Sequence, residues 1–190
     1  MLFRSLRPTL YYANSQHGDS KQQVTMTYHD PGAPTFKAEP AYLDPDKIVM
    51  PDAQKTGTFD PVTAMVTITT GLASAAKPCG VAVPIYDARR RYDIALSFDR
   101  KSKISMDNGL FSGEADVCRV GYKPLAGPPQ QVVRDGKVPP IRAWVAPVQS
   151  QGSAERFVVP LRVWAESDIG IGAAVLNSIK LDGVKIAKLK

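Results

Sequence analysis

The stretch that decides the fold is Val117-Cys118-Arg119-Val120-Gly121-Tyr122-Lys123-Pro124-Leu125-Ala126-Gly127, taken together with Lys77-Pro78-Cys79-Gly80. These two blocks carry the only two cysteines of the chain, and each lies against a run typical of a β-strand. We predict one disulfide between Cys79 and Cys118, which joins two parts of a β-rich domain and indicates an oxidising compartment. The alternative is a pair of reduced, buried cysteines in a cytosolic protein.

Composition indicates one globular domain spanning residues 1–190. The chain is long enough to bury a substantial core, and 44% of its residues are hydrophobic. It contains no apolar run of eighteen residues, so we do not expect it to span a membrane. Its 16 prolines and 14 glycines divide it into short pieces, which favours strands and turns over long helices.

The charge pattern indicates an ordinary solvated surface. Lys and Arg number 24 against 18 Asp and Glu, a net charge of +6 that is scattered along the chain. Such an excess can attract anionic partners. The basic run Arg89-Arg90-Arg91, flanked by Tyr86 and Tyr92, resembles a nucleic-acid site in composition only. We interpret it as a hairpin with ion pairs to Asp87 and Asp93, and we expect no nucleic-acid partner.

Residues 1–76 are expected to hold a strand pair and the single helix. Residues 2–12 and 23–28 form an antiparallel pair across a loose connection at 14–20, and the proline-rich segment 30–59 carries only short edge strands such as 35–39. Asp60-Pro61 predicts a helix start, since Asp accepts from free N–H groups and Pro suits the first helical position. We expect the helix to reach about residue 75 and to bury Met65, Val66, Leu72 and Ala73.

The rest of the chain alternates with a period of two residues, as strands with one buried face do. Hairpins are predicted for 81–86 with 91–98, for 103–106 with 115–123 around Asp107-Asn108-Gly109, and for 140–148 with 157–165. An extended stretch follows from 173 to 186, broken near Leu181-Asp182-Gly183. The expected fold class is mainly all-β: an antiparallel curved sheet or partly open β-barrel with one packed α-helix.

No catalytic, cofactor-binding or metal-binding residues are predicted. Gly170-Ile171-Gly172 lacks the third glycine, the βαβ context and the distant acid of a dinucleotide fingerprint. The two histidines lie far from both cysteines in sequence. The carboxylate pairs Asp87 with Asp93 and Glu114 with Asp116 have even spacing, which puts each pair on one strand face, but we interpret them as solvated charges.

Several motifs in a fixed order resemble the bacterial domain-of-unknown-function family 3108 (DUF3108). They cover roughly residues 1–186 and are listed here in chain order: Phe59-Asp60-Pro61, Pro78-Cys79-Gly80, Tyr86 to Asp93, Cys118 to Gly127, Ile141 to Pro147, and Phe157 to Val163 with Gly170-Ile171-Gly172 behind it.

The resemblance implies a secreted or periplasmic, mainly β protein without an established activity, and it suggests an analogy of fold with lipoprotein carriers and envelope sensors. Family members usually carry a signal peptide and several strands before Leu6-Arg7-Pro8. Residues 1–8 lack the apolar core and cleavage site of such a signal. We therefore expect that strands of the family's sheet are missing from this chain. The two cysteines and the resemblance indicate a periplasmic location, and the alternative is that the inference of export is wrong.

The favoured function is that of a non-catalytic envelope protein that binds an apolar ligand or a protein partner on a concave β face. Trp144 and Trp164 are the candidate ligand face, because they offer the largest contact area; the competing interpretation is that both fill the core. Two alternative functions remain: a structural or assembly factor of the cell envelope that pairs through an exposed sheet edge, and a hydrolase of envelope polymers that uses Asp or Glu.

Overall fold

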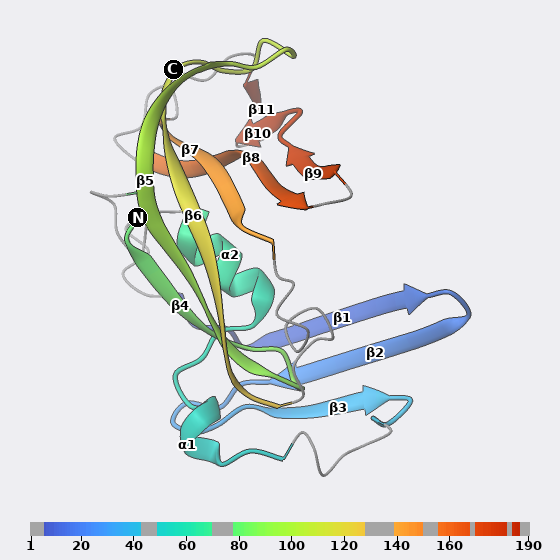
Figure 1. Cartoon of the computed structure of the whole chain (residues 1–190). Helices are drawn as coiled ribbons and strands as arrows, with labels where there is room; N and C mark the ends of the chain where they lie inside the picture. Colours follow the sequence, from blue (N-terminus) through green and yellow to red (C-terminus); the bar gives the residue numbers. More distant parts are fainter. Residues whose placement is uncertain are drawn as a thin grey trace. The chain divides into compact units, whose positions relative to one another are not determined.

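The computed structural model describes residues 6–42, 49–69, 78–127, 139–149, 156–167, 170–181 and 184–186 (Figure 1). Within them lie eleven strands and two short helices, as follows: β1 (Leu10–His17), β2 (Ser20–Thr27), β3 (Thr35–Glu39), α1 (Asp52–Lys55), α2 (Pro61–Thr69), β4 (Val81–Tyr86), β5 (Arg91–Ser105), β6 (Ser112–Ala126), β7 (Ile141–Gln149), β8 (Arg156–Ser167), β9 (Gly170–Val175), β10 (Ile179–Leu181) and β11 (Val184–Ile186).

The described strands form three open sheets. Their orders are β1-β2-β3, β4-β5-β6-β7-β8-β9 and β10-β11, so strands that are consecutive in sequence are neighbours throughout. The strand pairs β1–β2, β2–β3, β6–β7, β7–β8, β8–β9 and β10–β11 all run antiparallel. The predicted class, a mainly β fold of antiparallel sheet with a small helix, is confirmed.

Contacts group the chain into two compact units, each built from three separate segments. The first unit comprises residues 1–66, 83–94 and 122–137, and the second comprises residues 67–82, 95–121 and 138–190. The core of the first unit gathers side chains of β2, the segment before α1, and the turn after β4, with aromatic side chains packed around them. Its buried members are Val24, Met26, Met50, Tyr86 and Ala88. The prediction of a single domain stays a prediction.

The first hairpin is tighter than predicted. β1 and β2 do pair, but they pair over their whole lengths, from Leu10 opposite Thr27 to His17 opposite Ser20. The loose connection expected at 14–20 is therefore wrong. Gly18 and Asp19 form a two-residue turn, and Gly18 has a φ of 59°, a left-handed conformation that glycine adopts without a steric penalty. The predicted strand at 35–39 is β3, and its register is Thr35 opposite Thr27.

The helix start at Asp60 is confirmed. One carboxylate oxygen of Asp60 accepts the backbone N–H groups of Val62 and Thr63, both at 2.9 Å, and the other accepts the Thr63 hydroxyl. Asp60 is only 2% exposed, so these donors compensate for the burial of its charge. The short helix α1, in the segment expected to carry only short edge strands, was not predicted.

The predicted inward face of this helix is wrong where the structure describes it. Met65 is 64% exposed and Val66 is 39% exposed, whereas Ala64 and Thr67 are buried. The reason lies in how the helix begins: Phe59 bridges to Ile85 in parallel, and its backbone exchanges hydrogen bonds with Pro84 and Tyr86. These contacts and the Asp60 cap set which side of the helix is buried. Leu72 and Ala73 lie outside the described residues.

Two fifteen-residue strands, β5 and β6, run through both units and meet at a tight turn. The sequence predicted two separate strands at 91–98 and 103–106, whereas β5 is continuous. The turn at Asp107-Asn108-Gly109 is confirmed: Asn108 accepts the Leu110 N–H at 3.0 Å and Gly109 has a φ of 70°. The core of the second unit lies beside this turn and contains Ile104, Met106, Leu110, Phe111, Ala115, Ala146, Val159 and Leu161.

The remaining hairpins agree with prediction, although β5 and β8 are longer than predicted. β4 and β5 are joined by the turn Asp87–Arg90, and β7 and β8 pair from Ile141 opposite Ala165 to Gln149 opposite Arg156. The extended stretch expected from 173 to 186 is three strands, since β9 begins at Gly170 and ends at Val175, and β10 and β11 follow. The predicted break at Asp182-Gly183 lies outside the described residues.

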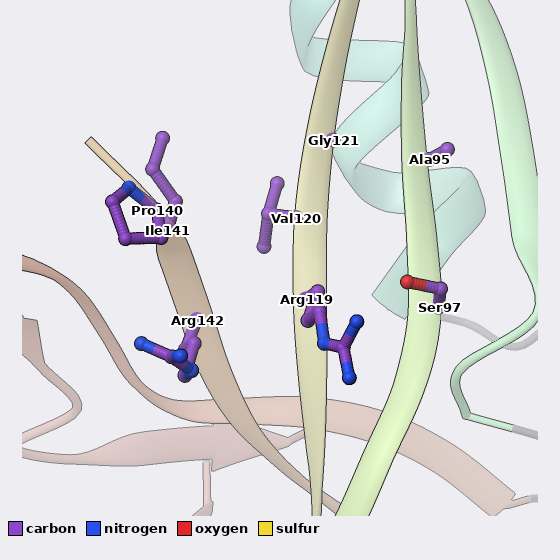
Figure 2. Close-up of a pocket in the computed structure, with 8 residues that line it drawn as sticks. All are labelled: Ala95, Ser97, Arg119, Val120, Gly121, Pro140, Ile141 and Arg142. Atoms are coloured by element: carbon purple, nitrogen blue, oxygen red, sulfur yellow. The ribbon is translucent and has the colours of Figure 1, made fainter. Parts of the chain in front are cut away.

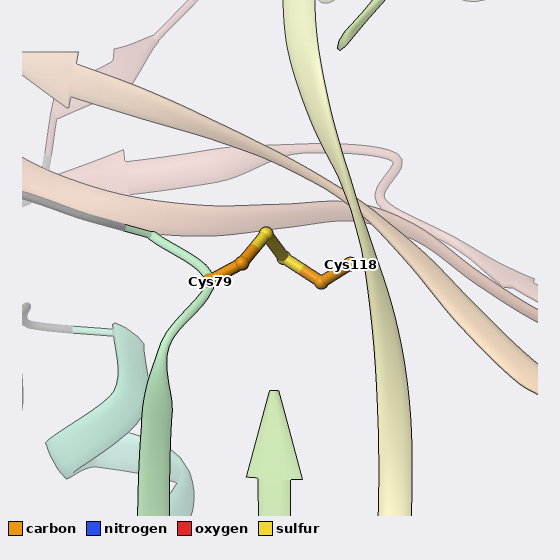
Figure 3. Close-up of a disulfide and its surroundings, with 2 residues drawn as sticks. All are labelled: Cys79 and Cys118. Carbon is orange, nitrogen blue, oxygen red and sulfur yellow. A yellow bond between two sulfur atoms is a disulfide. The ribbon is translucent and has the colours of Figure 1, made fainter. Parts of the chain in front are cut away.

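The disulfide between Cys79 and Cys118 is confirmed in the second unit (Figure 3). The two Cα atoms lie 5.5 Å apart, within the range that a disulfide spans. Cys79 precedes β4 and Cys118 lies on β6, while β5 is the strand between β4 and β6 in the sheet. Gly80 also donates its N–H to the Leu96 carbonyl of β5 at 2.7 Å. The disulfide therefore links the segment just before β4 to β6, a strand that is not the sheet neighbour of β4.

Candidate functional site

One face of the second unit presents cationic and aromatic side chains from β6, β7 and β8. Arg119 on β6 stands opposite Arg142 on β7, and Arg142 stands opposite Trp164 on β8. Two positions further along β7, Trp144 stands opposite Arg162. Because side chains alternate between the faces of a strand, all five residues share one face. We call it the arginine face.

A β-bulge lies directly beside this group of side chains. The β7–β8 register slips between Trp144 and Val145, so that Trp144 pairs with Arg162 but Val145 pairs with Pro160. Leu161 is the extra residue on β8, and it is fully buried in the core of the second unit. Because of the bulge, Leu161 has no partner in the β7–β8 register and is buried in the core. The next residue, Arg162, pairs with Trp144 and belongs to the arginine face.

The two tryptophans form one stacked group with an arginine. Their ring centroids are 5.4 Å apart with the planes inclined at 62°, an edge-to-face contact. The guanidinium carbon of Arg162 lies 5.2 Å from the Trp144 ring centroid and 5.6 Å from that of Trp164, within cation–π distance of both. Trp164 is 8% exposed and donates its indole N–H to Glu166 at 3.1 Å. Trp144 is half-buried and packs against the core.

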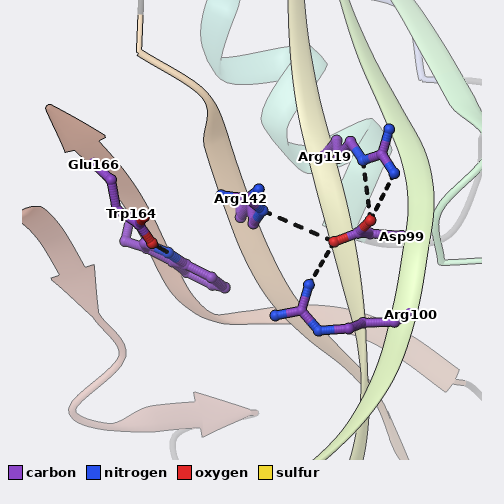
Figure 4. Close-up of polar contacts among 6 residues, drawn as sticks. All are labelled: Asp99, Arg100, Arg119, Arg142, Trp164 and Glu166. Carbon is purple, nitrogen blue, oxygen red and sulfur yellow. Dashed lines mark hydrogen bonds and ion pairs between the residues drawn. The ribbon is translucent and has the colours of Figure 1, made fainter.

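Asp99 of β5 contacts three arginines (Figure 4). One oxygen of Asp99 accepts both Nε of Arg119, at 3.1 Å, and Nη2 of Arg119, at 2.7 Å. Its other oxygen accepts Nη1 of Arg100 at 2.6 Å and lies 3.8 Å from Nε of Arg142. The Asp99 side chain is only 14% exposed. The hydrogen bonds from Arg119 lower the pKa of this carboxyl, so Asp99 is a carboxylate at neutral pH.

A pocket of about 260 Å³ lies between β5, β6 and β7, and its lining includes Arg119 and Arg142 of this face (Figure 2). Its lining residues are Ala95, Ser97, Arg119, Val120, Gly121, Pro140, Ile141 and Arg142. Most of this lining is apolar, and its only charged members are Arg119 and Arg142. Gly121 contributes no side chain, which leaves space above Ala95, since a Cβ at Gly121 would come no closer than 3.7 Å to the Ala95 carbonyl oxygen.

A second, more open hollow of about 370 Å³ lies at the other end of the β5–β6 pair. It is lined by Lys103, Ile104, Ser105, Ser112, Gly113 and Glu114. Its acidic member, Glu114, is already paired with Lys101 at 2.6 Å, and this contact lowers the pKa of Glu114. Neither of these two hollows is lined by a tryptophan.

Most of the chain matches a known protein family. Residues 3–177 match the family described as protein of unknown function, DUF3108. The chain belongs to the DUF3108 family. No curated protein and no solved structure matches the chain. The predicted resemblance is therefore confirmed over most of the length, and DUF3108 membership carries no activity with it.

Three of the four carboxylates singled out in the sequence of this DUF3108 member, Asp87, Asp93 and Glu114, are held in ion pairs or turns. Asp87 accepts the backbone N–H groups of Arg89 and Arg90 at 3.0 and 2.7 Å and pairs with the Arg90 side chain at 2.9 Å. Asp93 pairs with Arg91 at 2.6 Å. The ion-pair hairpin predicted for this basic run is what the structure contains. Glu114 pairs with Lys101, as described above.

The arginine face was not predicted as a site. Trp144 and Trp164 were singled out and do contact each other, and their role as a ligand face stays a prediction. Asp99, Arg119 and Arg142 were missed. In a hairpin, residues at equal distances from the turn lie opposite each other. Asp99 and Arg119 each lie about ten residues from the turn at 107–109, so the predicted hairpin could have indicated that they are neighbours. Arg142 depends on the β6–β7 register, for which the sequence offers no such local signal.

Proposed function

We propose that this DUF3108 protein is a non-catalytic binding protein of the bacterial cell envelope, and that its arginine face holds an apolar ligand or the apolar part of one. The observation that carries the proposal is the mostly apolar pocket between β5, β6 and β7, whose lining residue Arg142 stands opposite Trp164 in the β7–β8 register. Ligand sites are typically apolar concavities with a few placed polar groups. The pocket is small, so it suits a short apolar segment.

The location in the envelope, outside the cytosol, is supported by the disulfide. Both cysteines are buried and bonded, and such structural disulfides persist in oxidising compartments such as the periplasm. None of the helices in the described part of the chain is long and apolar enough to cross a membrane.

Intrinsic fluorescence tests the binding proposal directly, because the chain has only two tryptophans and both lie on the arginine face. Titration with the neutral probe 1-octanol should give a saturable change in emission. Gly121→Val should abolish this change, because valine fills the pocket above Ala95 while suiting a strand. Gly172→Val on β9 is the matched control, since its added side chain meets nothing within 4 Å.

Two results would refute binding at the pocket: no saturable change in the unmodified protein, or an equal change in Gly121→Val. Mass spectrometry of lipids that co-purify with the protein from a periplasmic preparation is an independent check, since a bound apolar molecule should be depleted from the Gly121→Val variant.

An assembly factor that pairs through a sheet edge is the second candidate. The observation that favours it is β9, which pairs with β8 on one side and has all six residues exposed and uncharged. Edge strands of this kind invite pairing with another chain. Ala174→Lys should prevent such pairing without affecting the pocket. Sedimentation or light scattering that shows the same monomer for both proteins would remove this candidate.

A further inference from the structure

Positive charge is in excess around Asp99. Three guanidiniums, those of Arg100, Arg119 and Arg142, surround a single carboxylate in the described structure. Arginine does not lose its proton in proteins, so the group carries two uncompensated positive charges. Glu166, the acid beside Trp164, already accepts the Trp164 indole N–H. An anionic ligand would therefore balance part of the excess positive charge on these arginines.

Arg142 has a donor that none of the described residues satisfies. Its Nε is buried and donates no hydrogen bond within the described part of the chain, and the nearest Asp99 oxygen is 3.8 Å away, beyond hydrogen-bond length. A buried donor without an acceptor is costly, and in native proteins it usually has a reason. Arg162 also has a buried Nε without an acceptor, but its guanidinium lies over two tryptophan rings, which compensate for part of the lost solvation.

Arg142 and Arg119 are also the two charged side chains of the pocket. They stand opposite each other across β6 and β7, and Arg119 is 64% exposed while Arg142 is 29% exposed. A carboxylate or phosphate placed at the mouth would meet donors from both strands, since guanidinium geometry suits the oxygens of either group.

We infer that the pocket ligand carries an oxyanion, a carboxylate or a phosphate, which Arg142 and Arg119 bind while its apolar part enters the pocket. This inference rests on the proposed function and adds the chemical class of the ligand. The oxyanion accepts hydrogen bonds from the guanidinium of Arg142, whose side chain is 29% exposed although its Nε is buried, and it neutralises part of the excess positive charge. The ligand class is thus an anionic amphiphile.

The test compares probes that share one chain and differ only at the head: octanoate, octyl phosphate and 1-octanol, with inorganic phosphate as the headgroup alone. Their affinities are measured by tryptophan fluorescence. Octanoate or octyl phosphate should bind about tenfold tighter than 1-octanol, the size expected for one charge-assisted hydrogen bond. Arg142→Gln should remove most of this preference, measured as the ratio of the octanoate affinity to the 1-octanol affinity within the same variant.

Arg100→Gln is the matched control. It removes the same charge from the same carboxylate, but Arg100 does not line the pocket, so the headgroup preference should stay within about twofold of the unmodified protein. Should Arg142→Gln fail to fold, Arg119→Gln replaces it, because Arg119 is largely exposed. Arg142→Lys should recover only part of the preference, since an ammonium lacks the planar fork.

The outcomes separate the two ideas. If 1-octanol and the two anionic amphiphiles bind equally, or if Arg100→Gln changes the preference as much as Arg142→Gln, the oxyanion inference is wrong and the apolar pocket stands. If no probe binds, both are wrong. If inorganic phosphate binds as tightly as octyl phosphate and needs Arg142, the oxyanion site is supported and the ligand is a free anion instead of a lipid headgroup.

Discussion

Breaking the disulfide between Cys79 and Cys118 should remove a large part of the stability of the fold. The bond closes a loop with a sequence separation of 39 residues. On the chain-entropy model such a loop stabilises the folded state by about 4 kcal/mol, because the unfolded chain loses freedom. With a urea dependence of about 2 kcal/mol per molar, the midpoint of unfolding should fall by about 2 M on reduction.

The assay is urea unfolding followed by circular dichroism, with and without a reductant equilibrated in advance. Cys79 is 4% exposed and Cys118 is fully buried, so the matched variant replaces both with alanine; serine would bury hydroxyl groups without partners. The double alanine variant should resemble the reduced protein and should not respond to reductant. It also loses the packing of two sulfur atoms, so its midpoint should be slightly lower than that of the reduced protein.

A reduced protein whose midpoint lies within about 0.5 M of the oxidised one would refute this reasoning. It would mean that the unfolded chain is already restricted around residues 79–118, so that the cross-link removes little further freedom. Such a result would leave the geometry of the bond untouched and would change only the account of what it contributes.

Three further predictions concern single side chains. Asp60→Ala should destabilise the protein by about 1–2 kcal/mol in urea unfolding, since it removes the acceptor of two helical N–H groups; a cost below about 0.3 kcal/mol would contradict the cap. Arg119→Gln should raise the pKa of Asp99 toward its ordinary value in an NMR titration, and an unchanged pKa would contradict the ion pair. In the unmodified protein this ion pair stabilises the folded state above about pH 4, and the stabilisation is lost as the pH falls through the lowered pKa of Asp99. Burial raises the pKa of Tyr28 and of Tyr86, so both side chains should stay neutral past about pH 10 in an ultraviolet titration. The folded protein should lose stability as the pH rises further, because both tyrosines ionise more readily in the unfolded chain. Ionisation of all seven tyrosines at about pH 10 without unfolding would contradict their burial.

Features decided by neighbouring residues could be predicted from the sequence. Asp60-Pro61 specifies a helix start through its own side chain and ring, and Asp107-Asn108-Gly109 specifies a tight turn through a left-handed glycine and a side-chain acceptor. The strand alternation likewise depends on one burial face per strand. These signals fixed the class and most of the hairpins because each acts over a few residues.

Features decided by distant contacts could not be predicted. The helix α2 is apolar on several sides, so the sequence alone did not indicate that Ala64 instead of Met65 would be buried; the bridge between Phe59 and Ile85 decides it. The arginine face needs the register of strands that lie far apart in the sequence. Arg119 and Arg142 become neighbours only through the β6–β7 pairing.

Gly127, just after β6, lies against the backbone of the turn between β4 and β5, and this contact determines which positions there tolerate substitution. A Cβ at this position would come within 2.3 Å of the Arg89 carbonyl oxygen, and the φ of Gly127 is 83°, so neither the space nor the backbone admits another residue. Arg89 and Arg90 can therefore be exchanged for other residues more readily than the glycine that their backbone touches. A library that randomises the basic turn while fixing position 127 should keep the fold, whereas the opposite library should lose it.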